Sequence, residues 1–231
     1  MHKYELSIAI PFYNEQDNIR NVVRSLLMEL NKNKVNYELI LVNNGSSDST
    51  PRIIENIRKS NPRIKQINIK KNQGYGYGVV SGLNAAKGEY IGFIDGDGQV
   101  SPRYAIDAYN KIKDAGAGLC ITKRSKRPER YIRKIASIGY NSILNSLFFT
   151  HFWDINSKPK IIKQKFYKQL NLYSKDWFID AEIVLKARRK NLKIIELPVI
   201  YRERSKGKSN IKSSIIKELL GDIIKFILKR T

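Results

Sequence analysis

The sequence predicts an α/β fold with a mostly parallel central sheet and helices on both faces. In residues 1–122, short apolar runs alternate with segments in which apolar residues recur every three or four positions, the pattern of strands alternating with helices. The connections between these segments are short, and repeated strand–helix–strand units with short connections form parallel sheets. The chain has 231 residues, of which 42% are hydrophobic, enough for a substantial core.

The expected elements follow one another closely. Apolar runs predict strands at Leu6–Pro11, Tyr37–Val42, Ile64–Ile69, Tyr90–Ile94, Ala117–Thr122 and Ile194–Pro198. Helical spacing predicts helices at Gln16–Leu30, Val79–Ala86, Pro102–Ala115 and Asp180–Lys190. In the first of them the apolar positions are Ile19, Val22, Val23, Leu26, Leu27 and Leu30. A further helix is expected after Asp48 or Ser49, because Pro51 suits a first helical turn.

Three polar segments stand where predicted strands end: Pro11–Glu15, Asn43–Asp48 and Asp95–Gln99. In open parallel sheets, ligands bind beyond the carboxyl ends of the strands. Asp95 and Asp97 lie two residues apart in a glycine-rich turn, and such a pair of carboxylates suits a hard divalent cation. An ordinary acidic turn is the alternative for this segment taken alone.

Positive charge is concentrated in the second half of the chain. The net charge is +22; residues 1–120 contain 16 Lys and Arg against 12 Asp and Glu, whereas residues 121–231 contain 27 against 9. This asymmetry predicts an anionic partner for the second half: nucleic acid, an anionic membrane or a phosphorylated substrate. A generally basic, solvated surface is the alternative.

Two segments of the second half have an amphipathic character. Residues 135–153 contain no Lys, Arg, Asp or Glu, but serine and asparagine interrupt them, so we expect an interfacial segment or a core helix and no membrane span. From Ile211 the apolar spacing predicts an amphipathic helix that either docks on the domain or lies on anionic lipid; the cations at its end favour lipid.

The cysteine content and the N-terminus bear on the cellular compartment. Cys120, the single cysteine, stands in an apolar stretch and is expected to be a buried residue without a catalytic role. One thiol forms no internal disulfide, which fits a reducing compartment. The segment Met1–Glu5 has no signal-peptide pattern, so a cytoplasmic location is expected.

Four motifs together resemble a known family: Pro11–Glu15, Asn43–Asp48, Asp95–Gln99 and Arg204–Ser209. They are similar to those of the inverting family 2 glycosyltransferases with the GT-A fold, most of all the polyprenyl-phosphate mannose or glucose synthases. The resemblance extends from about residue 5 to 210. It implies a nucleotide-sugar-binding half at 1–122 and an acceptor-binding half at 123–210. The amphipathic helix that the apolar spacing predicts follows at 211–231, where we expect a candidate membrane interface.

The resemblance implies a donor site in the first half. Asp95, Asp97 and Gln99 would hold Mg²⁺ or Mn²⁺, and the nucleotide-binding residues would be Pro11, Tyr13, Asn14, Glu15, Asn43, Gly74 and Asp95. The family usually has aspartate where this chain has Asn43, so GDP and UDP both stay open. Gly74 belongs to a G-x-G-x-G run, which either approaches the ligand or serves the local structure.

The resemblance also implies an acceptor site in the second half. The acceptor phosphate would be bound by Arg124, Arg133, Ser137, Arg204 and Ser209, and the catalytic residues would be Asp95, Asp97, Arg124 and Arg204. Lys160 stands where the family often has arginine, and the glycine that usually precedes it is absent.

The expected function is transfer of a hexose from a nucleotide sugar, of the GDP-mannose or UDP-glucose type, to a polyprenyl or dolichyl phosphate. The enzyme would work as a peripheral protein on the cytoplasmic face of the membrane. A phosphate acceptor is already ionised and needs no general base, whereas a hydroxyl acceptor does; Asp180 and Glu182 are the base candidates. Two alternatives stay open: transfer to a hydroxyl of a glycan, lipid or protein, and a basic nucleic-acid-binding α/β protein.

Overall fold

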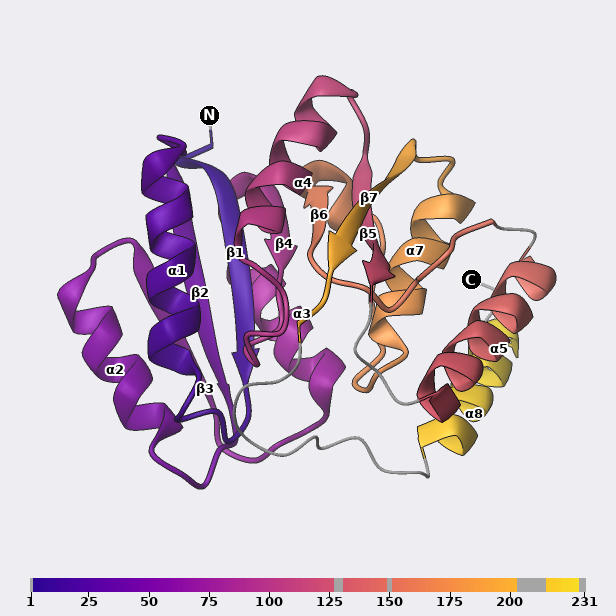
Figure 1. The fold of residues 1–231 in the computed structure, drawn as a ribbon, viewed down its shortest axis with the longest axis horizontal. Coiled ribbons are helices and arrows are strands. Elements are labelled where there is room, and N and C mark those ends of the chain that lie inside the picture. The colour runs from indigo at the N-terminus through magenta and orange to yellow at the C-terminus, as the bar shows by residue number, and fades with distance from the viewer. Residues whose placement is uncertain (1, 127–130, 149–150, 203–214, 229–231) are drawn as a thin grey trace.

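A central sheet separates two helical layers (Figure 1). The computed structural model describes residues 2–126, 131–148, 151–202 and 215–228. Within them, seven strands form one sheet in the order β3-β2-β1-β4-β6-β5-β7. The strands are β1 (Tyr4–Phe12), β2 (Tyr37–Asn44), β3 (Ile64–Ile69), β4 (Gly88–Phe93), β5 (Leu119–Lys126), β6 (Lys160–Lys163) and β7 (Ile194–Ile200). The helices are α1 (Ile19–Lys32), α2 (Thr50–Ser60), α3 (Tyr75–Ala85), α4 (Arg103–Asp114), α5 (Tyr131–Phe148), α6 (Gln164–Tyr167), α7 (Ile179–Arg189) and α8 (Ile215–Leu228).

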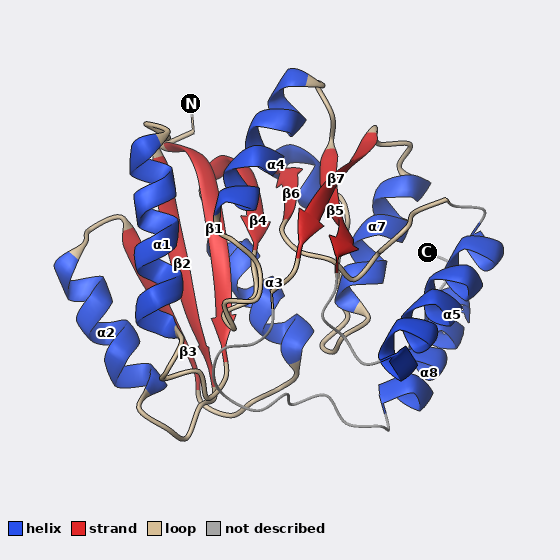
Figure 2. Cartoon of the chain, viewed as in Figure 1, coloured by secondary structure: helices blue, strands red, loops and turns tan. Residues whose placement is uncertain are grey.

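The two faces of the sheet have separate hydrophobic cores. Figure 2 shows the helices that surround the strands, which are drawn in red. On β1, Leu6, Ile8 and Ile10 point to the core made with α1, α2 and α4. Ala9 points to the other core, with α3, α5, α7 and α8. This alternation follows from the two-residue period of a strand. The predicted α/β architecture is therefore confirmed.

One strand runs against the others. β6 lies between β4 and β5 and is antiparallel to both, with Phe93 of β4 opposite Lys160 of β6. The sequence did not reveal it, because two isoleucines between lysines are too short a run to indicate a strand. Since β6 runs in the opposite direction, it begins at the edge where β4 ends. The residues just before β6 are thereby brought to the carboxyl edge of the parallel strands.

The C-terminal helix α8 packs beside α5 at one end of the molecule (Figure 1). The Phe226 ring is buried, and its centroid lies 5.5 Å from those of Phe148 and Phe178. Docking on the domain, one of the two alternatives for this helix, is therefore observed. On its other side Ile224 is 58% exposed, and Ile227 is exposed as well. Among the described helices, none is long and apolar enough to cross a membrane.

The sheet passes without interruption across the expected boundary at residue 122, which lies inside β5. The division into a donor half and an acceptor half is thus one of function within a continuous fold, and it stays a prediction. Residues 203–214, which contain the expected basic loop and the expected start of the last helix, lie outside the described residues.

Candidate active site

The turn after β4 places two carboxylates at the carboxyl edge of the sheet. Asp95 accepts a hydrogen bond of 2.7 Å from the Tyr75 hydroxyl, and its side chain is 22% exposed. Asp97 accepts one of 3.1 Å from the backbone N–H of Gln99. Gly96 is required here because a Cβ would lie 2.5 Å from the Phe12 ring. The packing of the turn on β1 therefore fixes the direction of both aspartates.

The residues of this turn fit a divalent cation. Asp95, Asp97 and Gln99 each carry a side-chain oxygen, and hard cations such as Mg²⁺ and Mn²⁺ bind one or two carboxylates together with phosphate oxygens. The amide nitrogen of Gln99 donates to the carbonyl of Arg202 at 3.3 Å. An amide that donates through its nitrogen still has its oxygen as a ligand atom. The chemistry of the donor set thus agrees with the predicted metal site.

The predicted nucleotide loops at the ends of β1 and β2 are joined by hydrogen bonds. The backbone N–H of Asn14 donates to the Ser46 hydroxyl at 3.0 Å, and the Asn14 amide oxygen accepts from the N–H of Ser47 at 2.9 Å. Asn14 has a φ of 53°, a left-handed conformation that asparagine tolerates. Pro11 is the last residue but one of β1 and is buried, and Tyr13 is half-buried. Nucleotide contact by Pro11, Tyr13 and Asn14 stays a prediction.

Two other predicted nucleotide residues are engaged within the protein. The Asn43 side chain accepts from the N–H of Ser46 at 3.0 Å and donates to Asn68 at 3.4 Å. Glu15 is buried and accepts a 2.6 Å hydrogen bond from the side chain of Asn18. Both side chains therefore stabilise the loops. Contact of Asn43 and Glu15 with a nucleotide stays a prediction. Ser49 is the N-cap residue of α2, and Asp48, just before it, accepts a hydrogen bond of 2.9 Å from the N–H of Thr50.

The glycine-rich run before α3 packs against the chain segment 174–177. A Cβ on Gly74 would lie 2.4 Å from the carbonyl oxygen of Lys175, and one on Gly76 would lie 2.6 Å from that of Asp176. This close approach accounts for both glycines through the local structure, so contact between Gly74 and a nucleotide stays a prediction. Between them, Tyr75 stacks on Trp177 with a centroid distance of 4.5 Å and an interplanar angle of 8°.

Two buried lysines and a buried aspartate lie next to this stack. Lys158 Nζ is 2.9 Å from Asp180 Oδ2 and 3.8 Å from Asp95 Oδ2. Lys160 donates to Asp180 Oδ1 and, at 2.8 Å, to the carbonyl of Ser157. The approach of Lys158 to Asp180 is an ion pair without hydrogen-bond geometry, since Oδ2 accepts no hydrogen bond from the described residues. The start of the antiparallel β6 brings both lysines to this edge.

The electrostatics of the cluster follow from burial and from the two aspartates. Burial alone lowers the pKa of Lys158, but the carboxylates of Asp180 and Asp95 outweigh it and raise the pKa above the ordinary 10.5. The pKa of Lys160 is lowered, because burial dominates there. Burial and the nearby Asp95 also raise the pKa of Tyr75 well above 10, so its hydroxyl remains a hydrogen-bond donor. Lys158 is thus a firmly charged ammonium.

The sequence pattern did not indicate Tyr75, Lys158 or Trp177 as site residues. Tyr75 stands in the G-x-G-x-G run, but its stacking on Trp177 depends on the approach of a chain segment about a hundred residues away. Lys158 is one of 43 Lys and Arg residues. Its burial depends on β6, the strand that the sequence did not indicate, so no local signal distinguishes it.

Both base candidates form ion pairs or hydrogen bonds with other groups of the protein. Asp180 lies in the first turn of α7 and pairs with the two lysines. Glu182 is completely buried; it accepts hydrogen bonds from the N–H groups of Tyr173 and Ser174, at 3.0 and 2.8 Å, and pairs with Lys186 at 2.7 Å. Neither carboxylate faces solvent, so neither is placed to accept a proton from an incoming hydroxyl.

Of the predicted acceptor residues, Arg124 is described at the side-chain level. Its Nη2 donates to Asp154 Oδ1 at 2.7 Å, its Nε donates to Oδ2 at 2.5 Å, and its guanidinium lies 5.2 Å from the Tyr201 ring centroid. This bidentate pair fixes the plane of the guanidinium at the end of β5. Arg133 and Ser137 lie on α5, without described side chains, and Arg204 and Ser209 lie outside the described residues. Their roles stay predictions.

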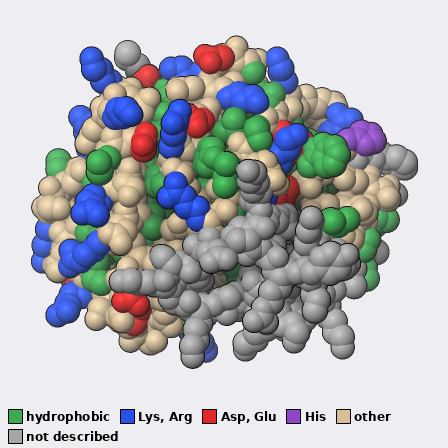
Figure 3. Space-filling model, viewed as in Figure 1, with side chains coloured by type: hydrophobic (Ala, Val, Ile, Leu, Met, Phe, Trp, Pro, Cys, Tyr) green, Lys and Arg blue, Asp and Glu red, His purple; other side chains and the backbone are tan. Residues whose placement is uncertain are grey.

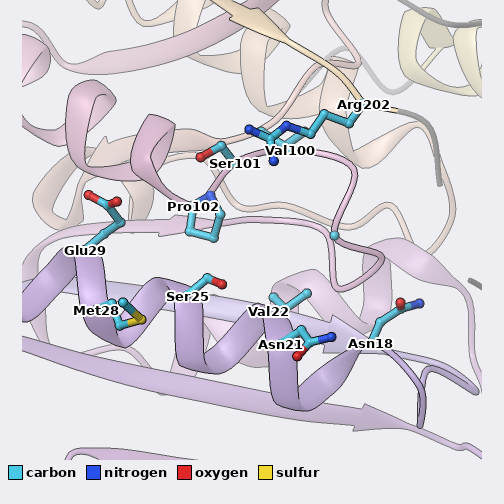
Figure 4. Close-up of a pocket in the computed structure, with 11 residues that line it drawn as sticks. Asn18, Asn21, Val22, Ser25, Met28, Glu29, Val100, Ser101, Pro102 and Arg202 are labelled. Carbon is cyan, nitrogen blue, oxygen red and sulfur yellow. The ribbon is translucent and has the colours of Figure 1, made fainter. Parts of the chain in front are cut away.

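A cavity of about 340 Å³ lies between α1 and the segment that follows Asp95–Gln99, the candidate metal turn (Figure 4). Ser25 and Glu29 line it from α1, Asn18 lines it from the N-cap of that helix, and Arg202 lines it from the segment after β7. Gly98, inside the Asp95–Gln99 turn, also lines it. The cavity therefore adjoins the candidate metal turn, and its wall contains both polar and apolar side chains.

Comparison with known proteins places this geometry in a family. The sequence model of the family described as glycosyl transferase family 2 matches residues 7–183. An uncharacterised glycosyltransferase of Synechocystis sp. is 31% identical over 143 residues, which are 62% of this chain and 45% of the relative. A dolichyl-phosphate beta-glucosyltransferase of Dictyostelium discoideum is 25% identical over 239 residues, which cover 95% of this chain and 73% of the relative. The chain thus spans less than half of the first relative and about three quarters of the second.

A solved structure agrees in fold. The glucosyl-3-phosphoglycerate synthase of Mycobacterium tuberculosis, in complex with Mn²⁺, uridine diphosphate and glucosyl-3-phosphoglycerate, matches with a TM-score of 0.72 at 17% identity. The match covers 98% of this chain and 80% of that one. The strand-end motifs, the sheet that presents them and the match over residues 7–183 lead to one conclusion: the chain belongs to glycosyl transferase family 2 and has the GT-A fold.

Proposed function

We propose that the protein transfers a hexose, with inversion, from a nucleotide sugar to a polyprenyl phosphate. A phosphate oxygen of the acceptor attacks the anomeric carbon in line with the departing nucleoside diphosphate. Asp95, Asp97 and Gln99 would hold Mg²⁺ or Mn²⁺, which when bound supplies Lewis-acid stabilisation of the leaving diphosphate. The loops after β1 and β2 bind the nucleoside, and their mutual hydrogen bonds keep them in place before the donor arrives.

The observation that carries this proposal is the engagement of both base candidates. A hydroxyl acceptor must lose a proton during the reaction, whereas a phosphate acceptor is ionised near neutral pH. Asp180 is held by two ammonium groups, and Glu182 is held by two backbone N–H groups and Lys186. A site whose carboxylates are occupied in this way favours an acceptor that needs no base.

Similarity to known proteins supports the acceptor class. The Dictyostelium relative, to which the chain is similar over nearly its whole length, is a dolichyl-phosphate beta-glucosyltransferase. Membership of glycosyl transferase family 2 accounts for the fold and for the motifs. We therefore prefer sugar transfer to the nucleic-acid-binding alternative. Donors of the GDP-mannose type and of the UDP-glucose type are both retained, since the hydrogen bonds of the Asn43 amide with Ser46 and Asn68 favour neither base.

We also propose that the enzyme works as a peripheral protein on the cytoplasmic face of the membrane. The neighbouring helices α5 and α8 carry exposed apolar side chains at Ile138, Ile143, Leu147, Ile224 and Ile227. Trp153 is 76% exposed, and Lys123 Nζ lies 5.7 Å from its ring centroid, a combination suited to a membrane interface. By contrast, the face formed by α1 and α2 carries scattered Lys and Arg side chains (Figure 3).

Donor turnover with and without polyprenyl phosphate tests the proposed reaction. Turnover of GDP-mannose or UDP-glucose is expected to require both polyprenyl phosphate and Mg²⁺ or Mn²⁺, and Asp97→Ala should lower it by about 100-fold or more. Asp107→Ala, which removes an aspartate that pairs with Arg103 on α4, is the matched control and should leave turnover unchanged. Full activity of Asp97→Ala would show that the metal assignment is wrong, and turnover with a hydroxyl acceptor alone would favour the hydroxyl alternative.

Sedimentation with liposomes tests the membrane proposal separately. Ile224→Glu places a charge on the exposed side of α8 and is expected to reduce co-sedimentation with anionic liposomes several-fold. Met28→Glu is the matched control, because Met28 is 65% exposed on α1. Equal loss in both variants, or loss in neither, would contradict a membrane contact at the α5–α8 end.

A further inference from the structure

Lys158 lies between the candidate metal turn and a buried ion pair. Its ammonium is 3.8 Å from Asp95 Oδ2 and 2.9 Å from Asp180 Oδ2, and its side chain is 6% exposed. The Tyr75 and Trp177 ring centroids lie 5.0 and 5.9 Å from the same nitrogen, and the Tyr75 hydroxyl donates to the other oxygen of Asp95. Asp95 therefore meets a hydroxyl through one oxygen and an ammonium through the other.

The charges of the cluster show what Lys158 adds. Asp180 already has a partner in Lys160, which is as deeply buried as Asp180 itself. With the ammonium of Lys158 added, the charges of Lys158, Lys160 and Asp180 sum to a net positive charge. When Asp95 is included, the cluster is neutral. Lys158 thus supplies a positive charge to Asp95 as well as to Asp180, and the two aromatic rings restrict where its ammonium can lie.

From this arrangement we infer that Lys158 is a donor-binding residue that fixes the order in which metal and nucleotide enter. Before the donor binds, its ammonium neutralises Asp95 and repels a dication from the turn. When a nucleoside diphosphate binds, its negative charge makes a second cation favourable, and Lys158 and the metal stabilise the diphosphate together. The metal then enters with the nucleotide. This inference rests on the proposed function and adds a residue and a binding order to it.

A solely structural role for Lys158 makes different predictions. If the lysine served only to hold Asp180, its loss would weaken the binding of every ligand by loosening the site. A fixed cation beside Asp95 acts in opposite directions on ligands of opposite charge. Its removal should strengthen the binding of a bare dication and weaken the binding of a diphosphate.

The experiment measures two affinities in Lys158→Met, Lys158→Arg and the wild type. Mn²⁺ binding without nucleotide is followed by the electron paramagnetic resonance signal of the free ion, and UDP binding in EDTA by calorimetry, with GDP in parallel. In Lys158→Met, Mn²⁺ should bind about tenfold more tightly or better, and UDP or GDP about tenfold more weakly. Lys158→Arg keeps the charge and should show smaller changes. Lys163→Met removes a lysine that lies on β6 beside Tyr90 and should change neither affinity.

The outcomes separate this inference from the proposed function. Opposite shifts of the two affinities support it, whereas unchanged affinities, or weaker binding of both ligands, overturn it. If Lys158→Met does not fold, the wild type still decides: equally tight Mn²⁺ binding with and without UDP or GDP overturns the inference. If the wild type binds neither nucleotide in the presence of Mn²⁺, the proposed function itself fails.

Discussion

Replacing Asp180 by asparagine is expected to destabilise the fold strongly, because it removes a carboxylate that pairs with two buried lysines. The side chains of Asp180 and Lys160 are each 1% exposed. Asparagine keeps the shape but leaves one ammonium without a counter-charge. Removing one member of a buried ion pair costs about 3–5 kcal/mol. For a chain of this size, that loss lowers the melting temperature by roughly 6–20 °C.

The structure also sets an upper limit on this cost. Lys160, whose pKa burial already lowers, can lose its proton in the variant. Keeping a lysine with an ordinary pKa of 10.5 neutral at pH 7 costs about 5 kcal/mol. The unfolded chain of the variant then binds one proton more than the folded chain. Its stability relative to the wild type should therefore rise with pH, by about 1.4 kcal/mol per pH unit between pH 7 and pH 9.

Urea unfolding followed by circular dichroism measures these free energies. The double variant Asp180→Asn, Lys160→Met removes the unpaired ammonium and should recover most of the loss, whereas the matched surface variant Asp107→Asn should change stability by less than about 0.5 kcal/mol. The reasoning is refuted if Asp180→Asn stays within about 1 kcal/mol of the wild type at pH 7 and shows no added pH dependence. Loss of transfer with donor binding retained in such a stable variant would instead favour Asp180 as a general base.

Three further changes test other parts of the structure. Glu182→Gln weakens the hydrogen bonds to the backbone at 173–174 and should cost about 1–3 kcal/mol in urea unfolding; an unchanged midpoint would contradict the anchoring role. Gly82→Ala should cost about 1–3 kcal/mol in the same assay, because a Cβ there would lie 2.6 Å from the Cβ of Ala9, and a neutral result would mean that α3 moves easily. Burial raises the pKa of Cys120 to about 12, so iodoacetamide should modify it at pH 8 in urea but not in the native protein; rapid native modification would contradict its burial.

The parallel part of the sheet and the edge that carries the motifs follow from local sequence. The strand Ile64–Ile69 was predicted with the bounds that are observed, and the turn Asp95–Gln99 lies at the end of β4 as expected. Such elements depend on apolar periodicity and turn chemistry within a few residues. The sequence therefore sufficed to place the candidate metal turn, although its ligands and the nucleotide contacts stay predictions.

Features that depend on distant chain segments were not predictable in the same way. The pairing of β6 with β4 joins residues about 70 positions apart, and K-I-I-K has no distinctive pattern of its own. The surroundings of Lys158 depend on that pairing. The glycines around Tyr75 indicated a close approach, but the sequence did not show that the partner is the protein segment 174–177. Each of these features depends on tertiary contacts, which local sequence patterns do not show.

The antiparallel strand β6 also has a consequence for folding during synthesis. Strands β1 to β4 pair with one another as soon as residues 4–93 are made, since none of them needs a later strand to complete their parallel ladder. β5, in contrast, pairs with β6 and β7, so a further 33 residues must be made after residues 119–126 before their first partner begins. During that interval β5 exposes an unpaired apolar edge of the kind that chaperones bind. The arrival of β6 ends this exposure and, in the same event, brings the buried lysines to the carboxyl edge of the parallel strands.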